Sequence, residues 1–181
     1  MRKIIATLFI SLDGVTEAPE TWHFPYLNDE MNQVVAAQME AADALLLGRR
    51  TYEVFAAHWP RQDATKDPMA ATLNAAPKYV LSTTLTTPSW ENTTVLAGDP
   101  HKELTRLKER PGKHIGVTGS VSLVAWMLRE GLLDELTLLV HPIVLGAGKR
   151  LFDDGIGTLP LTLTRSETFS TGVLNLTYER A

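Results

Sequence analysis

The chain has 181 residues, of which 44% are hydrophobic and 21% charged, a balance typical of globular proteins rather than disordered or fibrous ones. The formal net charge is -4, so the composition gives no electrostatic indication of nucleic-acid binding. Cysteine is absent, which excludes disulfides, zinc–thiolate sites and thiol nucleophiles. We expect one domain over 1–181, because globular domains usually have about 50 to 200 residues.

The N-terminal segment begins like a signal peptide, with two basic residues before an apolar run. The run ends after about nine residues, at Ser11-Leu12-Asp13-Gly14, and no small-residue cleavage site follows. No apolar stretch approaches the ~20 residues that cross a bilayer. We therefore expect a cytoplasmic protein without a membrane partner.

Predicted strands and helices alternate along the chain. Apolar, often β-branched residues over Ile4–Leu12 predict a strand buried on both faces. Asn28 is typical of a helix N-cap, and the helix it begins runs to about Ala41. The elements that follow are a strand over Ala44–Leu47, a helix after Gly48, a short helix over Pro68–Leu73, strands over Lys78–Ser82 and Thr93–Leu96, a helix over Pro100–Arg110, a strand over His114–Val117, a helix over Ser122–Glu130, and strands over Asp134–Val140, Leu161–Ser170 and Val173–Arg180.

This order predicts an α/β fold with a mixed, mostly parallel sheet flanked by helices. Strands that alternate with helices favour parallel pairing, and the last two strands form an antiparallel C-terminal hairpin. Ligands of such sheets bind at the carboxyl ends of the strands. The loops at those ends are therefore the candidate site.

Gly48-Arg49-Arg50-Thr51 follows a strand and opens a helix. Glycine permits close approach of a phosphate, the helix start offers free amides, and arginine binds phosphate oxygens in a planar fork. An ordinary helix start with two solvated arginines explains the same residues, so both interpretations stay open.

Two further loops carry hydroxyl groups. Ser82-Thr83 ends a strand, where a turn alone accounts for it. Thr118-Gly119-Ser120 closes a strand and opens a helix, so its amides could hold a pyrophosphate. Capping of that helix by Ser120 or Ser122 is the alternative.

Other chemistry finds no support in the sequence. The histidines are scattered without the spacing of a metal site. Gly146-Ala147-Gly148-Lys149-Arg150-Leu151 matches neither a dinucleotide fingerprint nor a P-loop. Asp29 and Glu30 are the candidate catalytic carboxylates, although capping of their helix explains both. We expect no metal.

Taken in order, the motifs resemble the dihydrofolate reductase superfamily. They are Ser11-Leu12-Asp13-Gly14, Leu47-Gly48-Arg49-Arg50-Thr51-Tyr52-Glu53, Val80-Leu81-Ser82-Thr83 and Val117-Thr118-Gly119-Ser120. Leu132–Leu136 and His141–Phe152 are similar, more narrowly, to the RibD C-terminal family, which is the reductase domain of the riboflavin deaminase-reductase. The resemblance implies a three-layer dihydrofolate reductase-like fold and a stand-alone reductase without the deaminase domain.

The resemblance also implies NADPH as the cofactor. Gly48, Arg49, Arg50 and Thr51 would hold its pyrophosphate and 2′-phosphate region, and Ser82 and Thr83 would lie by the adenosine 2′-phosphate. Thr118, Gly119 and Ser120, with the flanking Val117, Val121 and Ser122, would lie by the pyrophosphate. Ala6, Asp13, Gly14, Val15 and Thr16 would lie near the nicotinamide.

The predicted activity is reduction of a small nitrogen heterocycle, such as 5-amino-6-(5-phosphoribosylamino)uracil in riboflavin biosynthesis. Dihydrofolate reductase activity and a non-catalytic nucleotide-binding module are the alternatives. Asp29, Glu30 or a bound water would deliver the proton, and Trp22 and Phe24 belong to a loop on the substrate side. The resemblance also implies a homodimer, with Leu161, Leu163, Leu174 and Leu176 of the hairpin in its interface or in an internal core.

Overall fold

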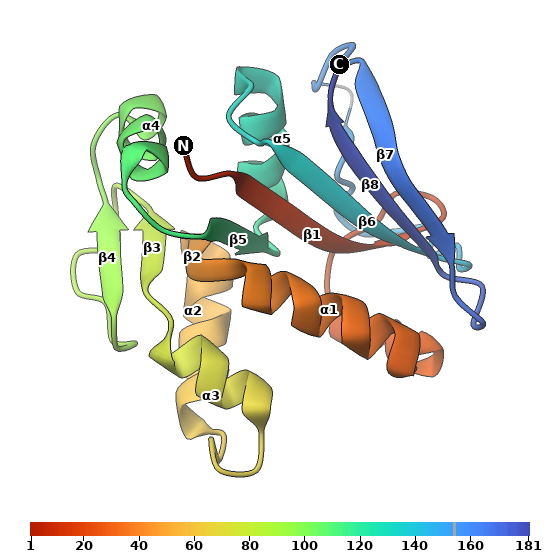
Figure 1. Cartoon of the computed structure of the whole chain (residues 1–181), viewed down its shortest axis with the longest axis horizontal. Helices are drawn as coiled ribbons and strands as arrows, with labels where there is room; N and C mark the ends of the chain where they lie inside the picture. The colour runs from red at the N-terminus through yellow and green to blue at the C-terminus, as the bar shows by residue number, and fades with distance from the viewer. Residues whose placement is uncertain (154) are drawn as a thin grey trace.

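The computed structural model describes residues 1–153 and 155–181, and these residues form one eight-stranded sheet in the order β4-β3-β2-β5-β1-β6-β8-β7 (Figure 1). The strands are β1 (Ile4–Ser11), β2 (Ala42–Gly48), β3 (Lys78–Leu81), β4 (Thr93–Leu96), β5 (His114–Thr118), β6 (Glu135–His141), β7 (Leu161–Thr168) and β8 (Leu174–Arg180). The helices are α1 (Asp29–Ala41), α2 (Arg49–His58), α3 (Pro68–Ala75), α4 (Pro100–Glu109) and α5 (Val121–Glu130).

Strand β1 lies in the middle of the sheet and is buried on both sides. It pairs in parallel with β5, where Ala6 lies opposite Val117, and with β6, where Ala6 lies opposite Leu136. The pairs from β4 to β6 are all parallel, while β8 is antiparallel to β6 and β7 is antiparallel to β8. The predicted mixed, mostly parallel sheet with an antiparallel C-terminal hairpin is confirmed.

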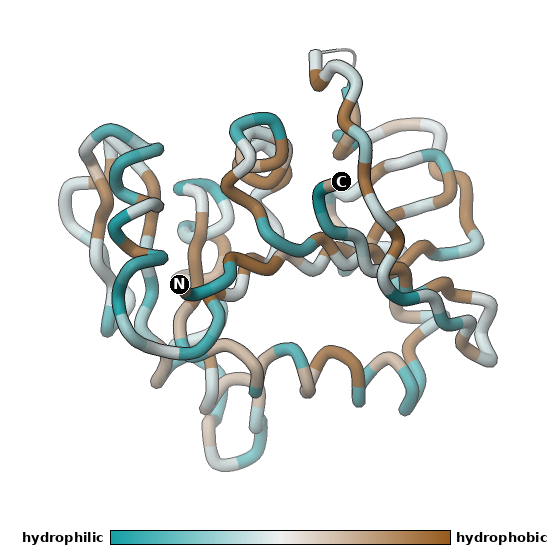
Figure 2. Tube along the Cα trace, turned by 45° about the horizontal axis from the view of Figure 1, so that its top comes forward, coloured by the Kyte–Doolittle hydropathy of each residue, from teal (hydrophilic) through white to brown (hydrophobic). Residues whose placement is uncertain are grey.

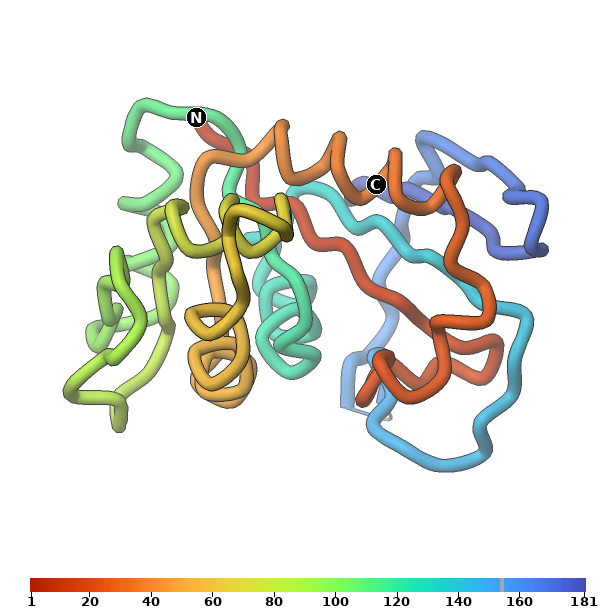
Figure 3. The backbone as a smooth tube through the Cα atoms, turned by 90° about the horizontal axis from the view of Figure 1, so that it is seen from below, coloured from red at the N-terminus to blue at the C-terminus, as the bar shows by residue number. Residues whose placement is uncertain are grey.

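Helices cover both faces of the sheet. The even-numbered residues of β1, from Ile4 to Ile10, pack in one cluster with Leu104 and Leu107 of α4 and with the buried face of α5. On the opposite face, Met31 of α1 packs against β6 and the hairpin turn. Figure 1 shows α4 and α5 above the strands and α1 and α3 below them. Figure 3 shows α1 running across the sheet from the hairpin side to β2.

Hydropathy follows this layering. In Figure 2 the apolar colour runs along the central strands, whereas α4 is largely polar. That helix still buries Leu104 and Leu107, and full burial of a leucine side chain contributes about 1.5 to 3 kcal/mol. Among the described residues, no helix is both long and apolar enough to span a membrane.

Caps define where most helices begin and end. The side chain of Asn28 accepts from the backbone N of Met31, as predicted, and Asp67 and Asp99 cap α3 and α4 in the same way. Gly131 ends α5 at a φ of 69°, in the left-handed region that glycine adopts without strain. The starts of α2 and α5 have no side-chain cap.

The leucines of the C-terminal hairpin do not pair with one another. Leu163 lies opposite Tyr178, and Leu174 lies opposite Thr168, because the turn at 169–173 places the leucines of the two strands at opposite ends. Strand β7 forms the edge of the sheet and is largely exposed. An internal leucine core of the hairpin is therefore not present.

Candidate functional site

A cleft of about 830 Å³ opens at the carboxyl ends of β2 and β5, between these strands, β1 and α1. Its volume lies in the upper part of the ~300–1,000 Å³ range of small-molecule and cofactor sites. The connection from β1 leads through α1 to β2, and the connection from β5 leads through α5 to β6 on the other side. The connections that follow the neighbouring strands β1 and β5 thus run in opposite directions along the sheet. In α/β sheets, ligands usually bind at the point where the direction of the connections reverses.

One end of the cleft is built from the starts of α2 and α5. The Ser120 hydroxyl accepts a hydrogen bond of 2.7 Å from the Gly48 amide, and the Ser120 amide donates one of 2.9 Å to the Thr51 hydroxyl. Ser120 thus ties the two loops together instead of capping its own helix. Both helix starts remain open, and such amide groups together with the helix dipole attract anions.

The backbone of these two loops is closely packed. Gly119 has a φ of +69°, and a Cβ atom there would lie 3.0 Å from Cγ2 of Thr51. A Cβ atom on Gly48 would lie 3.2 Å from Oγ of Ser120. Side chains at either position would push apart the hydroxyl groups that join the loops.

Basic side chains gather at the same end. Arg49, Arg50 and Lys149 line the cleft. Arg49 is half-exposed and forms an ion pair of 2.9 Å with Glu53, whereas Arg50 forms none with the described residues. The Lys149 ammonium contacts the hydroxyl of Ser122 in the first turn of α5. This end therefore combines positive side chains with free helix amides.

The opposite wall is mainly apolar. It is formed by Ile5, Thr7 and Phe9 of β1 and by Val35, Gln38 and Met39 of α1. The Thr7 hydroxyl donates a hydrogen bond of 2.7 Å to Oε1 of Gln38. A flat ring could lie on this wall with the Thr7–Gln38 pair at its edge.

Two buried histidines lie at the far end of this wall. His23 lines the cleft and stacks on Phe9, with ring centroids 4.7 Å apart. His141 lies edge-on to Trp22 and Phe9, and its Nδ1 is hydrogen bonded to the Leu139 carbonyl at 2.8 Å. Burial lowers the pKa of both histidines, which favours neutral rings at neutral pH. Nδ1 of His23 and Nε2 of His141 are buried and have no partner among the described residues.

Many of the predicted cofactor residues line the cleft together. They are Thr16, Gly48–Thr51 and Val117–Ser122. Ala6 belongs instead to the core on the other face of the sheet.

The loop after β1 fastens a second loop. The Asp13 carboxylate accepts hydrogen bonds from the amides of Leu145 and Gly146, at 3.1 and 2.9 Å, and pairs with Arg150. The Ser11 hydroxyl and these amides hold the pKa of Asp13 well below its usual range. Asp13, Gly14 and Val15 are not among the lining residues, although Thr16 is. Figure 3 shows the two loops side by side.

Ser82 and Thr83 lie at the end of β3 and do not line the cleft. The Ser82 hydroxyl accepts from the amides of Thr84 and Leu85, at 3.2 and 3.0 Å. This is the turn that the sequence alone favours.

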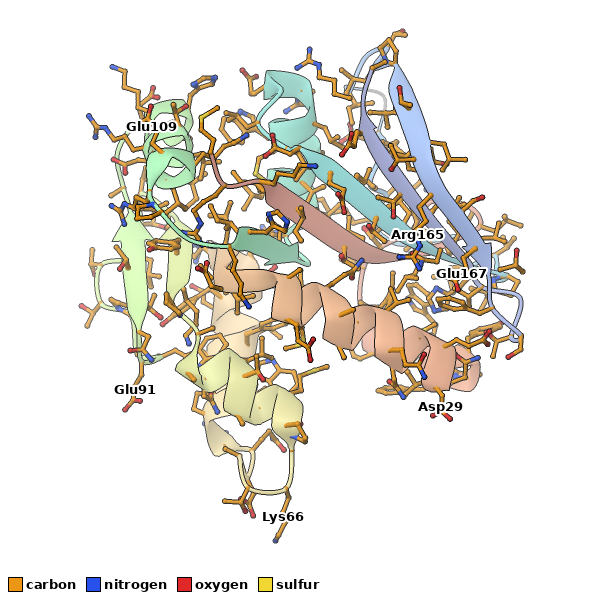
Figure 4. The ribbon with its side chains drawn as sticks, in the orientation of Figure 1. Asp29, Lys66, Glu91, Glu109, Arg165 and Glu167 are labelled. Carbon is orange, nitrogen blue, oxygen red and sulfur yellow. The ribbon has the colours of Figure 1, made fainter. Side chains whose placement is uncertain are left out.

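Asp29 and Glu30 do not line the cleft either. Asp29 lies at the outer end of α1 with its carboxylate directed away from the sheet (Figure 4). Glu30 accepts from the amide and hydroxyl of Ser170, at 2.8 and 2.6 Å, and these bonds lower its pKa. Glu30 is thus engaged at the start of the helix, and the exposed Asp29 faces away from the cleft.

The predicted substrate-side aromatics flank His23. Trp22 is buried, and its Nε1 donates to the Glu17 carbonyl at 3.0 Å. Phe24 is exposed and packs against the His23 ring with centroids 4.3 Å apart. Of this segment, His23 lines the cleft and the two aromatics do not.

The cleft residues that the sequence analysis did not assign to the site include the polar side chains of Thr7, His23, Gln38 and Lys149. Two of them carried a detectable signal. Thr7 interrupts an apolar strand, and Gln38 lies in a helical stripe with Val35 and Met39. Polar residues in such patterns face either solvent or a site, and local sequence does not separate the two cases.

The mixed, mostly parallel sheet flanked by helices, with a cationic cleft at the carboxyl ends of its strands, agrees with the dihydrofolate reductase-like fold that the sequence resemblance implies. The family model of the RibD C-terminal domain matches residues 2–175. The chain therefore belongs to the RibD C-terminal family.

Relatives agree with this assignment. The uncharacterized protein YyaP of Bacillus subtilis (strain 168) is 31% identical over 187 residues, which cover 98% of this chain and 94% of that protein. Among solved structures, a protein of Shewanella sp. PV-4 that is provisionally assigned to riboflavin biosynthesis has a TM-score of 0.79 at 24% identity, covering 99% of each chain. The riboflavin biosynthesis reductase Rib7 of Saccharomyces cerevisiae has a TM-score of 0.65 at 14% identity, covering 99% of this chain and 90% of that one. These structural likenesses show the fold.

Proposed function

We propose that this protein is an NADPH-dependent reductase of a small nitrogen heterocycle, of the type that reduces 5-amino-6-(5-phosphoribosylamino)uracil. The observation that carries the proposal is the pair of uncapped helix starts, joined through Ser120, beside Arg50 and Lys149 in one cleft. Family membership supports a reductase, and the name of Rib7 supports riboflavin biosynthesis as its setting.

The residues of the cleft fit NADPH. Gly48 and Gly119 allow the two loops to pack against each other, and the open amides of α2 and α5 favour negative charge. Arg49 and Arg50 would hold the additional phosphate, because guanidinium groups bind phosphate bidentately. When bound, NADPH supplies a hydride for transfer to an electrophilic carbon.

The chain itself would bind and orient the ring. Phe9 and Val35 offer apolar surface that excludes water, and Thr7 and Gln38 offer polar atoms at the ring edge. Of the proton donors predicted from the sequence, Asp29 and Glu30 do not line the cleft, which leaves a bound water molecule as the proposed donor. The proposed substrate partner is a small molecule, with no nucleic acid.

Titration with NADPH and NADH, followed by nicotinamide fluorescence, tests the cofactor. We expect saturable binding of NADPH at least about tenfold tighter than that of NADH, and loss of that discrimination in Arg50→Ala, since a guanidinium–phosphate contact is worth about 1.5 to 3 kcal/mol. Arg106→Ala on α4, outside the cleft lining, is the control that leaves both affinities unchanged. Absence of saturable binding, or equal affinity for the two nucleotides, contradicts the proposal.

Turnover separates the proposed reaction from its alternatives. Oxidation of NADPH in the presence of 5-amino-6-(5-phosphoribosylamino)uracil supports the proposed reductase. Faster oxidation with dihydrofolate indicates a dihydrofolate reductase. Binding of NADPH without hydride transfer to any pyrimidine or pterin indicates a nucleotide-binding module.

A further inference from the structure

The Thr7–Gln38 pair is a polar feature in an otherwise apolar part of the cleft. Gln38 lies on α1 with Val35 and Met39, and Thr7 lies on β1 between Ile5 and Phe9. Thr7 and Phe9 are the half-buried residues of a strand that is otherwise buried. Both partners are therefore accessible from the cleft rather than enclosed in the core.

The hydrogen bond between them fixes the direction of the Gln38 amide. The Thr7 hydroxyl donates to Oε1 at 2.7 Å, so Nε2 and its two N–H groups point away from Thr7. Nε2 has no acceptor among the described residues. A ring on this wall would thus meet N–H donors at its edge and would match them with a carbonyl oxygen.

The positions of the acidic residues also favour a neutral ring edge at the Thr7–Gln38 pair. Glu17 and Glu20 are the carboxylates among the described residues that line the cleft, and both belong to the loop after β1. The acidic residues of α1, Asp29, Glu30 and Glu40, do not line it. Nothing on the α1 wall would stabilise a protonated or amidine-like ring edge, which pairs with a carboxylate.

We propose that Gln38, positioned by Thr7, selects neutral rings that present a carbonyl oxygen and disfavours rings that present an amino group at the same place. The proposal rests on the proposed function, because it assigns the substrate end of the same cleft. Gln38 acts here by direct contact with the ring, and Thr7 is a positioning residue.

Lumazine and pterin are matched probes for this selection. Both are fluorescent pteridines with a carbonyl group at C4, and they differ at C2, where lumazine has a carbonyl and pterin an amino group. We expect wild-type protein to bind lumazine more tightly. Gln38→Glu replaces the donors by acceptors that suit the amino edge, so the ratio of the pterin Kd to the lumazine Kd should fall by at least about tenfold, the effect of one exchanged polar contact of about 1.4 kcal/mol.

Gln33→Glu is the control. It makes the same chemical change on the exposed side of α1, outside the cleft lining, and should leave the ratio at its wild-type value. Thr7→Val keeps the size of the side chain but frees the amide to rotate, so the ratio should move toward one. Thermal unfolding of each variant confirms that the fold is intact.

The outcomes separate this proposal from the reductase proposal. An unchanged ratio in Gln38→Glu, an equal shift in Gln33→Glu, or binding of neither ring by the wild type overturns the selection by Gln38, whether or not NADPH binds. A shifted ratio without NADPH binding supports the selection and contradicts the cofactor. Unchanged NADPH affinity in the Gln38 and Thr7 variants places the effect at the ring and not at the phosphates.

Discussion

At the scale of single residues, the least expected side chain is the buried lysine of β3. Lys78 is fully buried, and its ammonium donates to the carbonyls of Leu73, Asn74 and Ala76 at 2.7, 3.0 and 2.7 Å. The Trp90 ring lies 4.3 Å from the nitrogen. Lys78 thus satisfies carbonyl groups at the end of α3 that have no partner within the helix.

Burial lowers the pKa of Lys78 from 10.5 to about 8. Between those values the unfolded chain binds a proton that the folded protein has released, so the free energy of unfolding rises with pH in this window and is flat below it. Relative to Lys78→Met, we expect wild-type stability to increase by about 3 kcal/mol from about pH 8 to about pH 10.5. Urea unfolding across this range measures the difference, and a difference that does not change with pH contradicts the assignment.

At the scale of elements, the site depends on the way two helix starts are joined. Strand β2 leads into α2, strand β5 leads into α5, and Ser120 bonds to both Gly48 and Thr51. The two starts are therefore held as one unit. Displacement of either helix start would disturb both sets of free amides.

Gly119→Ala tests this unit. The new methyl group would crowd Thr51 at a φ of +69°, so we expect a loss of about 1 to 3 kcal/mol in stability and weaker NADPH binding. Gly157→Ala is a matched control, because Gly157 has a φ of +75° but nothing within 4 Å. It should be destabilised without a change in NADPH affinity. Equal NADPH affinities in the two variants would show that the contact with Thr51 is not needed.

The strands and helices could be predicted from sequence because each rests on a local pattern. The apolar runs and Asn28 indicate where elements begin, and the structure confirms them. The Thr7–Gln38 bond joins residues 31 positions apart, and no periodicity reports which polar side chains will meet. The same holds for Ser120, which the sequence left open as a possible cap of its own helix and whose hydroxyl instead accepts from the amide at another strand end.

At the scale of the whole molecule, the sheet ends on one side in an exposed strand. Strand β7 is the edge strand, seven of its eight residues are exposed, and half of the surface of Leu163 is open to solvent. Figure 4 shows Arg165 and Glu167 close together on this strand, where they form an ion pair of 3.1 Å. Exposed edge strands pair readily with a second chain unless they are protected.

We propose that β7 mediates a homodimer. Light scattering should give twice the mass of one chain for the wild type and the mass of one chain for Leu163→Lys, because a buried unpaired charge opposes association. Val144→Lys changes an apolar residue that is also exposed but lies in the loop after β6, and it should remain dimeric. A monomeric wild type, or dissociation by Val144→Lys alone, is inconsistent with this interface.

The central position of β1 has a consequence for how the protein can vary. Its even-numbered residues lie in the core with α4 and α5, and its odd-numbered residues Ile5, Thr7 and Phe9 line the cleft, where Leu8 of the core also contributes. In a library of β1 variants, changes at the even positions should lower the amount of folded protein in the cell. Changes at Thr7 should alter which ligands bind while the amount of protein stays the same. Substitutions on the cleft side of β1 could therefore change which ligand the protein binds over many generations, while the protein stays folded at each step.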